Sequence, residues 1–240
     1  MLKSNFTLKY FYLLVFCFTA ILNPIQAQIP RLCFDKNSNA SSFYGGLESN
    51  KTIPEGIKTQ AIIALSYFPE LKKVKIIFRV REKKIPLTTR PDLISLFKNR
   101  GKRVYIITIS SKSNEKLSPI LFFKLPYNAQ IGVLGHELAH VSDFNTKSTL
   151  QLISLFFKMI SSDFVDQFEF NTDLICINHG LGYQLLDWSK YVRKVLDIDN
   201  WGGASNKDSL ERTGSKKQRY MNPVTIEEYI ALNPVYKSVR

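Results

Sequence analysis

The chain has 240 residues, which is long enough for one well-cored domain and short for two. Hydrophobic residues make up 45% of it and charged residues 22%, which are ordinary globular proportions that exclude a wholly disordered chain. There are 33 Lys and Arg against 20 Asp and Glu, so the formal net charge is +13 and anionic partners are favoured. The basic residues are scattered and no nucleic-acid-binding motif is visible, so we expect no specific nucleic-acid partner.

The N-terminus has the pattern of an export signal. Lys3 and Lys9 precede an uninterrupted apolar run over residues 10–22. A helix of that length spans roughly 20 Å, against a hydrocarbon core of about 30 Å. We therefore expect residues 1–27 to be a cleaved signal peptide, with an uncleaved anchor as the alternative. The remaining residues, 28–240, then form a single domain exported to the periplasm or the extracellular space.

The first half of this domain contains the patterns of short strands and helices. A helix is expected over residues 57–67, where Pro69 closes it. Residues 73–80 and 103–110 are rich in β-branched and aromatic side chains, which predicts strands. The shorter predicted elements are a helix over residues 90–103, with Asp92 in its first turn and Gly101 at its end, and a third strand over residues 118–125.

Helical patterns dominate the second half of the chain. They cover about 128–143, 147–160, 163–179 and 183–196, and a loop over 197–223 follows. The last helix covers residues 225–232, where Thr225 and Glu228 have the spacing of a capping box. Strands followed by helices predict an α+β fold, with a small mixed sheet packed on the helix at 128–143, rather than a parallel βαβ fold.

Two cysteines remain after the signal peptide is removed, Cys33 and Cys176. In an oxidising compartment they either form the one possible disulfide or are two separately buried thiols. Removal of Lys3 and Lys9 lowers the formal net charge from +13 to +11. This charge indicates electrostatic association with anionic envelope surfaces. The basic cluster at 214–219 lies among Gly, Ser and Asn and reads as a solvated loop.

The sequence HELAH at residues 136–140 holds two of the three histidines of the chain. On a helix His140 lies about 40° from His136, on the same face and one turn along, and the aliphatic residues lie on the opposite side. Gly132 and Gly135 flank the histidine face and leave room for a close approach. Two imidazoles at this spacing bind one Zn²⁺, and Glu137 between them is the candidate general base.

Acidic residues on the helix at 163–179 are the candidates for a third ligand. Asp163, Asp166, Glu169 and Asp173 fall within about 120° on one helical face. The alternative is a solvated acidic face, but the neighbouring apolar residues bury this helix in a strongly basic chain. Concentrated acid on a buried helix indicates a nearby cation. His179 is a rival ligand, but it lies roughly 15 Å along the helix from Glu169 and reads better as a helix end.

The spacing then resembles a known family. HELAH is followed 29 residues after His140 by E-x-x-x-D at residues 169–173, which resembles the gluzincin metallopeptidases and their compact minigluzincin branch. The resemblance covers about residues 103–196, and Thr172 stands where the family often has a smaller residue. It implies a zincin-like fold, zinc bound by His136, His140 and Glu169, and a supporting role for Asp173.

The resulting hypothesis is zinc-dependent hydrolysis of peptide bonds in a peptide or protein substrate, with Glu137 as general base on zinc-bound water. The alternative is a catalytically silent zincin-like scaffold that acts as a binding or structural protein of the envelope. An extended substrate is expected to pair with the edge of a strand, either 118–125 or 103–110. The sequence assigns no oxyanion stabiliser among Tyr183, Tyr191, Arg193 and Tyr220, and leaves the oligomeric state open.

Overall fold

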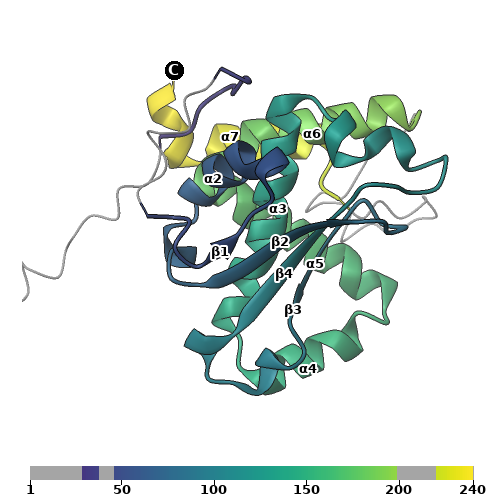
Figure 1. The fold of residues 1–240 in the computed structure, drawn as a ribbon. Coiled ribbons are helices and arrows are strands. Elements are labelled where there is room, and N and C mark those ends of the chain that lie inside the picture. The colour runs from purple at the N-terminus through teal and green to yellow at the C-terminus, as the bar shows by residue number, and fades with distance from the viewer. Residues whose placement is uncertain (1–28, 38–45, 199–219, 240) are drawn as a thin grey trace, which may run out of the picture.

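The structure, a computed structural model, describes residues 29–37, 46–198 and 220–239. These residues form an α+β fold with one small sheet and a mostly helical second half (Figure 1). The expected signal peptide at 1–27 and the basic cluster at 214–219 lie outside the described residues. Within the described ranges, no helix combines the length and the apolar character needed to cross a bilayer.

A four-stranded sheet forms one layer, with its strands in the order β1-β2-β4-β3. β1, β2 and β4 run parallel to one another, whereas β3 pairs antiparallel with β4 and forms an edge of the sheet. The predicted strands at 73–80 and 103–110 are present as β2 and β4, and the sheet is mixed. The strands are β1 (Lys51–Thr52), β2 (Lys75–Arg81), β3 (Leu87–Pro91) and β4 (Val104–Ser110).

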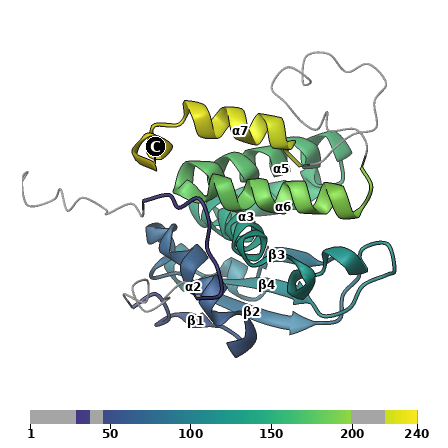
Figure 2. The ribbon, with the colours of Figure 1, turned by 90° about the horizontal axis from the view of Figure 1, so that it is seen from above.

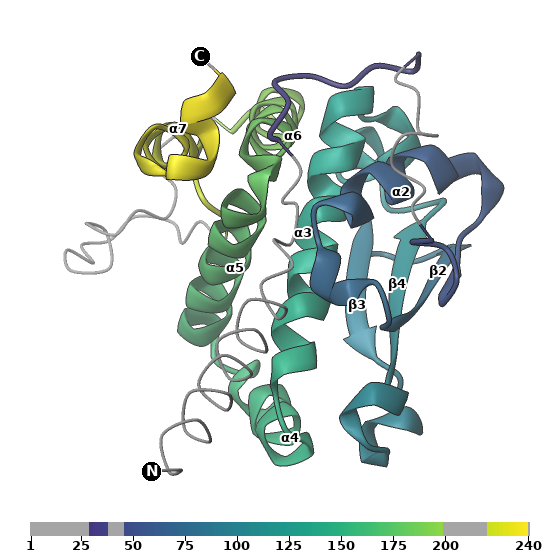
Figure 3. The same ribbon diagram turned by 90° about the vertical axis from the view of Figure 1, so that its left-hand side faces the viewer.

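The helices form the other layers. Figures 2 and 3 show α3 in the middle, between the sheet on one side and α5, α6 and α7 on the other. α2 joins β1 to β2 and packs against α3. The helices are α2 (Lys58–Ser66), α3 (Tyr127–Thr146), α4 (Thr149–Lys158), α5 (Ser162–Cys176), α6 (Gly182–Val195) and α7 (Pro223–Leu232).

The core lies between the sheet and α3. Alternate residues of β2 and β4 point toward the helices, because side chains alternate between the two faces of a strand. The strand residues that are almost fully buried there are Ile76, Phe78, Tyr105, Ile107 and Ile109. Every residue of α3 from Asn128 to Val141 is also buried. The predicted aliphatic face of this helix is buried, and the face that carries the histidines is buried as well, because layers on both sides enclose α3.

Two predicted elements differ in the structure. Residues 118–125, predicted as a strand, form two 3₁₀ turns, Ser118–Ile120 and Phe122–Lys124. Apolar composition alone does not separate a buried turn from a strand, and Pro119 cannot donate a ladder hydrogen bond. The predicted helix over 90–103 is also wrong: β3 occupies residues 87–91, and only short 3₁₀ turns follow it.

The start of the last helix also differs from its prediction. Asn222, rather than Thr225, is the N-cap of α7, and its side-chain oxygen accepts a hydrogen bond from the Thr225 amide at 2.8 Å. Pro223 occupies the first turn, where its missing N–H costs nothing. The helix therefore begins one turn earlier than the predicted capping box placed it.

Close contact between α3 and α6 depends on a glycine. A Cβ atom at Gly132 would lie 2.1 Å from the carbonyl oxygen of Gln184 and 2.8 Å from the amide nitrogen of Leu185. At Gly135 it would lie 2.6 Å from Cδ1 of Leu181. The room predicted at these two glycines is thus filled by α6 and by the turn that leads into it.

We expect Gly132→Ala to lower the free energy of unfolding by at least about 2 kcal/mol. Alanine gains about 1 kcal/mol in helix propensity, but the Gln184 backbone cannot yield as a flexible side chain would. Urea unfolding followed by circular dichroism measures the difference. Gly101→Ala is the control, because nothing lies within 4 Å of its added Cβ. Equal stability of Gly132→Ala and wild type would contradict the described packing of α3 on α6.

Candidate metal centre

α3 and α5 lie side by side in opposite directions, and this pairing brings the predicted ligands together. Nε2 of His136 lies 3.1 Å from Oε2 of Glu169, and Nε2 of His140 lies 3.3 Å from the same oxygen. Nδ1 of His136 lies 2.7 Å from Oδ1 of Asp173. Residues 136 and 140 thus face residues 173 and 169, as the antiparallel alignment of the two helices requires.

His136, His140 and Glu169 form a cluster that could hold a metal ion. One ligand atom from each residue lies within 4.8 Å of the other two, and in the part of the chain that the structure describes this is the one such group. The two histidines are buried, and the Glu169 side chain is 12% exposed. Two imidazole nitrogens and one carboxylate oxygen are a donor set that suits a transition-metal ion such as Zn²⁺.

Hydrogen bonds orient both imidazoles toward Glu169. The hydroxyl of Thr172 donates to the carbonyl oxygen of Phe168 at 2.9 Å, so at His140 it acts as the acceptor of an Nδ1–H bond, at 3.2 Å. Asp173 likewise accepts from Nδ1–H of His136. These Nδ1–H bonds place both Nε2 atoms on the side of Glu169, where each can offer a lone pair to a metal ion once it carries no proton.

The pKa values of the cluster reflect this pairing. Burial by itself would lower the pKa of His136, but hydrogen bonds to Asp173 and Glu169 and their charges hold it well above its ordinary value. Burial would raise the pKa of Glu169, yet hydrogen bonds from His136 and His140 outweigh that effect and lower it. A metal ion that binds here therefore displaces a proton from His136.

Asp173 also ties the last part of the chain to the cluster. Its second oxygen, Oδ2, accepts a hydrogen bond from the Met221 amide at 2.8 Å. Tyr220, the residue before, lies edge-on to His136 with 5.6 Å between ring centroids, and Trp188 lies 5.7 Å from the same ring. The site is thus built from α3 and α5, and α6 and the start of the C-terminal segment cover it. Nothing in the sequence of residues 180–188 predicts this position of Trp188.

Glu137, the candidate base, is held by a residue that the sequence did not single out. Oγ1 of Thr89, on the edge strand β3, donates to Oε2 of Glu137 at 2.6 Å. Glu137 is itself buried, with 6% of its surface exposed. The sequence around Thr89 does not predict a strand, because Pro86 precedes it and Pro91 ends it. The hydrogen bond fixes one carboxylate oxygen of Glu137 and leaves the other one for a reacting group.

The rival ligand lies elsewhere. Nδ1–H of His179 donates to the carbonyl oxygen of Ile175 at 2.8 Å, and its Nε2 lies 3.1 Å from Oε1 of Glu70. The ring also stacks on Phe68, with 4.3 Å between centroids. α5 ends at Cys176, and His179 lies in the π-helical turn Ile177–Leu181 that follows it, one residue before the left-handed Gly180 (φ 95°). His179 is therefore near the helix end, as predicted, and away from the cluster.

The other acidic residues of α5 and the two cysteines also lie outside the cluster. Asp163 is exposed and Asp166 half-buried, and neither belongs to the cluster. Cys33 is exposed and Cys176 buried, and both are free thiols. Burial and the charge of Asp173 raise the pKa of Cys176 well above its usual range, so its thiol stays protonated.

A cavity of about 470 Å³ opens beside the cluster, with His136 and Glu137 in its wall. Of the four oxyanion candidates, Arg193 and Tyr220 line this cavity. Tyr191 instead donates to the Lys124 carbonyl oxygen at 3.1 Å. The rest of the wall is mostly apolar and includes Ile85, Leu87, Leu117, Ile120, Val133, Trp188, Val192, Leu196 and Ile198.

Comparisons with known proteins identify no relative of this chain. No protein-family model matches the chain, and neither a curated protein nor a solved structure matches it.

We expect His179→Gln to cost about 1 kcal/mol of stability at pH 6 and less at pH 9. Burial alone would lower the pKa of His179, but its hydrogen bonds to Glu70 and to the Ile175 carbonyl raise it. A histidine whose pKa is higher in the folded than in the unfolded state stabilises the fold when it is protonated. This contribution is complete at a pH below the unfolded-state pKa of about 6.5, and it is lost as the pH rises through the folded-state pKa.

Urea unfolding of the two proteins at each pH measures this difference, and Glu70→Gln is the matched variant. Because the pKa of Glu70 is lowered, its carboxylate stays charged at pH 6 and the two variants should lose similar amounts. An equal loss for His179→Gln at pH 6 and pH 9 would show that the native histidine is already neutral at pH 6.

Proposed function

We propose that the protein is an exported, zincin-like metallopeptidase of gluzincin type. In this proposal His136, His140 and Glu169 bind Zn²⁺, and Glu137 is the general base for hydrolysis of a peptide bond. The observation that carries it is the convergence of the three ligand atoms within 4.8 Å, next to a buried glutamate that faces a cavity. The resemblance of the HELAH and E-x-x-x-D motifs to gluzincins points the same way.

The spacing of the ligand atoms supports zinc. Tetrahedral ligands at about 2.0–2.1 Å from a zinc ion lie about 3.3 Å from one another. The distances from Oε2 of Glu169 to the two histidine Nε2 atoms are 3.1 and 3.3 Å. These two distances already suit a zinc ion that His136, His140 and Glu169 would hold together.

The chemistry follows from the position of Glu137. Bound zinc supplies an acidified water and a polarised carbonyl group. Glu137 takes one proton of the water as its oxygen adds to the carbonyl carbon, and delivers that proton to the nitrogen as the C–N bond breaks. The hydrogen bond from Thr89 to Oε2 leaves Oε1 of Glu137 to handle the proton. A carboxylate that is already oriented loses little entropy in reaching the transition state.

The edge strand β3 supports an extended polypeptide as substrate. Its pairing with β4 includes bonds from Asp92 N to Val104 O and from Ser110 N to Pro86 O. In an antiparallel ladder the groups that bond the partner alternate with those that point away from it, so the backbone of Leu87 and Thr89 faces the free edge. The edge of β3 is thus the proposed substrate-binding edge, in place of the two predicted from the sequence. Residues 118–125 form turns, and residues 103–110 contain β4, which lies in the interior of the sheet.

The cavity supports a preference for bulky apolar side chains. It lies beside Glu137 and His136, its volume is about 470 Å³, and most of its wall is aliphatic or aromatic. Burial of an apolar side chain in such a wall contributes about 1.5–3 kcal/mol. Arg193 in the same wall offers a donor for a substrate carbonyl or carboxylate. The substrate expected is thus a peptide with a large hydrophobic residue next to the bond that is cleaved.

We expect Glu137→Gln to abolish peptide hydrolysis while leaving the fold and bound zinc intact. The loss should be about 10²-fold or more, because no other base lies between the two histidines. Cleavage of a peptide library that contains Leu and Phe, read by mass spectrometry with zinc-loaded protein, measures it. His179→Gln serves as the active control. Wild-type rates in Glu137→Gln would exclude Glu137 as the base, and an inactive wild type with bound zinc would favour the silent scaffold.

We expect zinc affinity to separate the ligands from the residues that orient them. In competition with a chelator, Glu169→Ala should bind zinc most weakly. Asp173→Ala and Thr172→Val should lose about 10–100-fold, and His179→Ala should match wild type. Thr172→Ser keeps the hydroxyl and should restore binding. Circular dichroism of each variant distinguishes loss of metal from loss of fold. If His179→Ala releases zinc and Glu169→Ala retains it, the proposed ligand set is wrong.

A further inference from the structure

One end of the molecule carries a concentration of exposed hydrophobic side chains. Two segments form it: residues 92–103, between β3 and β4, and residues 149–160, which are α4 and the turn after it. Of the fourteen large hydrophobic side chains exposed in the described ranges, seven lie in these segments. They are Leu93 (61%), Ile94 (80%), Phe97 (77%), Leu150 (79%), Phe156 (44%), Phe157 (70%) and Ile160 (85%), and together they are called the apolar end face.

Hydrogen bonds hold the two segments next to each other, so the exposed hydrophobic side chains share one end of the molecule. Oγ1 of Thr149 donates to the carbonyl oxygen of Leu96 at 3.0 Å. The guanidinium of Arg103 donates to the Lys147 carbonyl oxygen at 2.6 Å and to Oγ1 of Thr149 at 2.9 Å. Figures 1 and 3 both place α4 and the connection between β3 and β4 at the same end of the molecule.

The pattern of α4 is not that of an ordinary surface helix. Its buried side chains are Leu152 and Leu155. Leu150 and Phe157, seven residues apart, lie on a shared face two turns apart and point outward. A surface helix of a monomeric soluble protein normally carries polar residues on that face. An apolar cluster of this kind therefore marks a binding surface.

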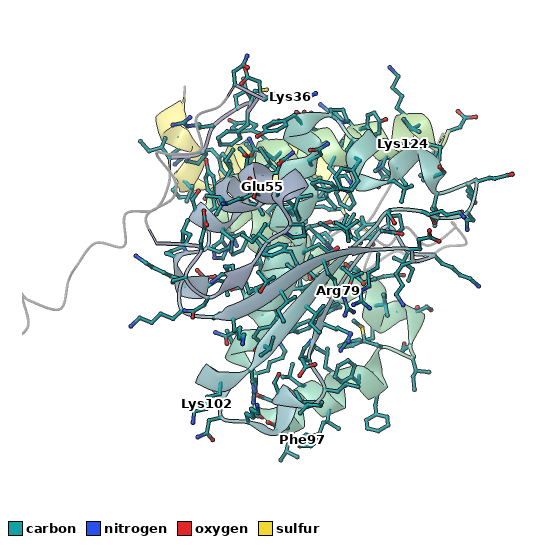
Figure 4. All side chains as sticks on the ribbon, in the orientation of Figure 1. Lys36, Glu55, Arg79, Phe97, Lys102 and Lys124 are labelled. Atoms are coloured by element: carbon teal, nitrogen blue, oxygen red, sulfur yellow. The ribbon has the colours of Figure 1, made fainter. Side chains whose placement is uncertain are left out.

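Exposed basic residues lie in the same two segments as the apolar end face. Lys98, Arg100, Lys102 and Lys158 are all exposed there, and Asp92 is the only acidic residue in either segment. Figure 4 shows Phe97 and Lys102 together at this end, with Lys36 at the opposite end. Two copies of the chain docked through this face would bring like charges together, whereas an anionic surface would neutralise them.

We propose that the apolar end face docks the protein onto the surface of an anionic phospholipid bilayer. The Phe, Leu and Ile side chains enter the boundary between head groups and acyl chains, and the exposed lysines and Arg100 contact lipid phosphates. Docking through this face holds β3 close to the bilayer, because the strand ends at Pro91 and Leu93 is already on the face. This inference goes beyond the proposed peptidase activity and does not depend on it.

Sedimentation with lipid vesicles tests the proposal without metal or substrate. The chain from Gln28 onward, which keeps every described helix and strand, is mixed with vesicles of phosphatidylglycerol and phosphatidylcholine in equal amounts, or of phosphatidylcholine alone. We expect binding to the anionic vesicles that falls at least about tenfold in the double variant Phe97→Ser, Phe157→Ser. Lys102→Ser should weaken it about fivefold.

Matched controls remove equally exposed residues elsewhere. The double variant Leu32→Ser, Leu232→Ser deletes side chains that are 65% and 76% exposed, and Lys36→Ser deletes a charge at the opposite end. These should bind as wild type does. Failure of the wild type to bind anionic vesicles, or equal losses in the controls, would overturn the proposal. So would a dimer, seen by analytical ultracentrifugation, that Phe97→Ser abolishes while vesicle binding is absent.

Discussion

The antiparallel packing of α3 on α5 is the constraint on which the rest of the structure depends. It sets His136 against Asp173 and both histidines against one oxygen of Glu169. Neither helix could be buried with these charged groups unpaired, because each would carry a large desolvation cost. The polar pairs inside the core therefore fix the register of the two helices, and the apolar residues around them supply the stability.

The neighbouring elements are arranged around this pair of helices. Gly132 allows the backbone of α6 to touch α3, which brings Trp188 over His136. Asp173 uses its second oxygen to hold the Met221 amide, so the segment that leads into α7 is attached to the same residue that orients His136. On the other side, Thr89 links the edge of the sheet to Glu137. Each layer of the fold thus contributes one contact to the candidate metal centre.

Local patterns in the sequence were sufficient to predict the site residues that lie on helices. The spacing of His136 and His140, and that of Glu169 and Asp173, follows from helical periodicity, and the structure brings all four together. The sequence also predicted that His179 ends its helix away from the cluster. These inferences hold because positions on one helix are fixed relative to one another whatever surrounds the helix.

The remaining parts depend on contacts between distant segments. β3 is short, follows Pro86, ends at Pro91 and pairs with β4 alone, so its own residues do not identify it as a strand. Thr89 could be connected with Glu137 only once that strand was placed. Thr172 looked like a departure from the gluzincin pattern, and its hydrogen bond to His140 appears only when α3 and α5 are docked. The burial of α3 on every side also could not be predicted from its own residues, because it depends on the layers that pack on both sides of the helix.

The most direct measurement of the central claim is anomalous diffraction at the zinc absorption edge from crystals grown with one equivalent of zinc. We expect a single peak about 2.0–2.1 Å from Nε2 of His136 and of His140 and within coordination distance of a Glu169 oxygen. A peak between His179 and Glu70, or no ordered zinc near α3 and α5, would contradict the proposed centre and the peptidase mechanism that depends on it.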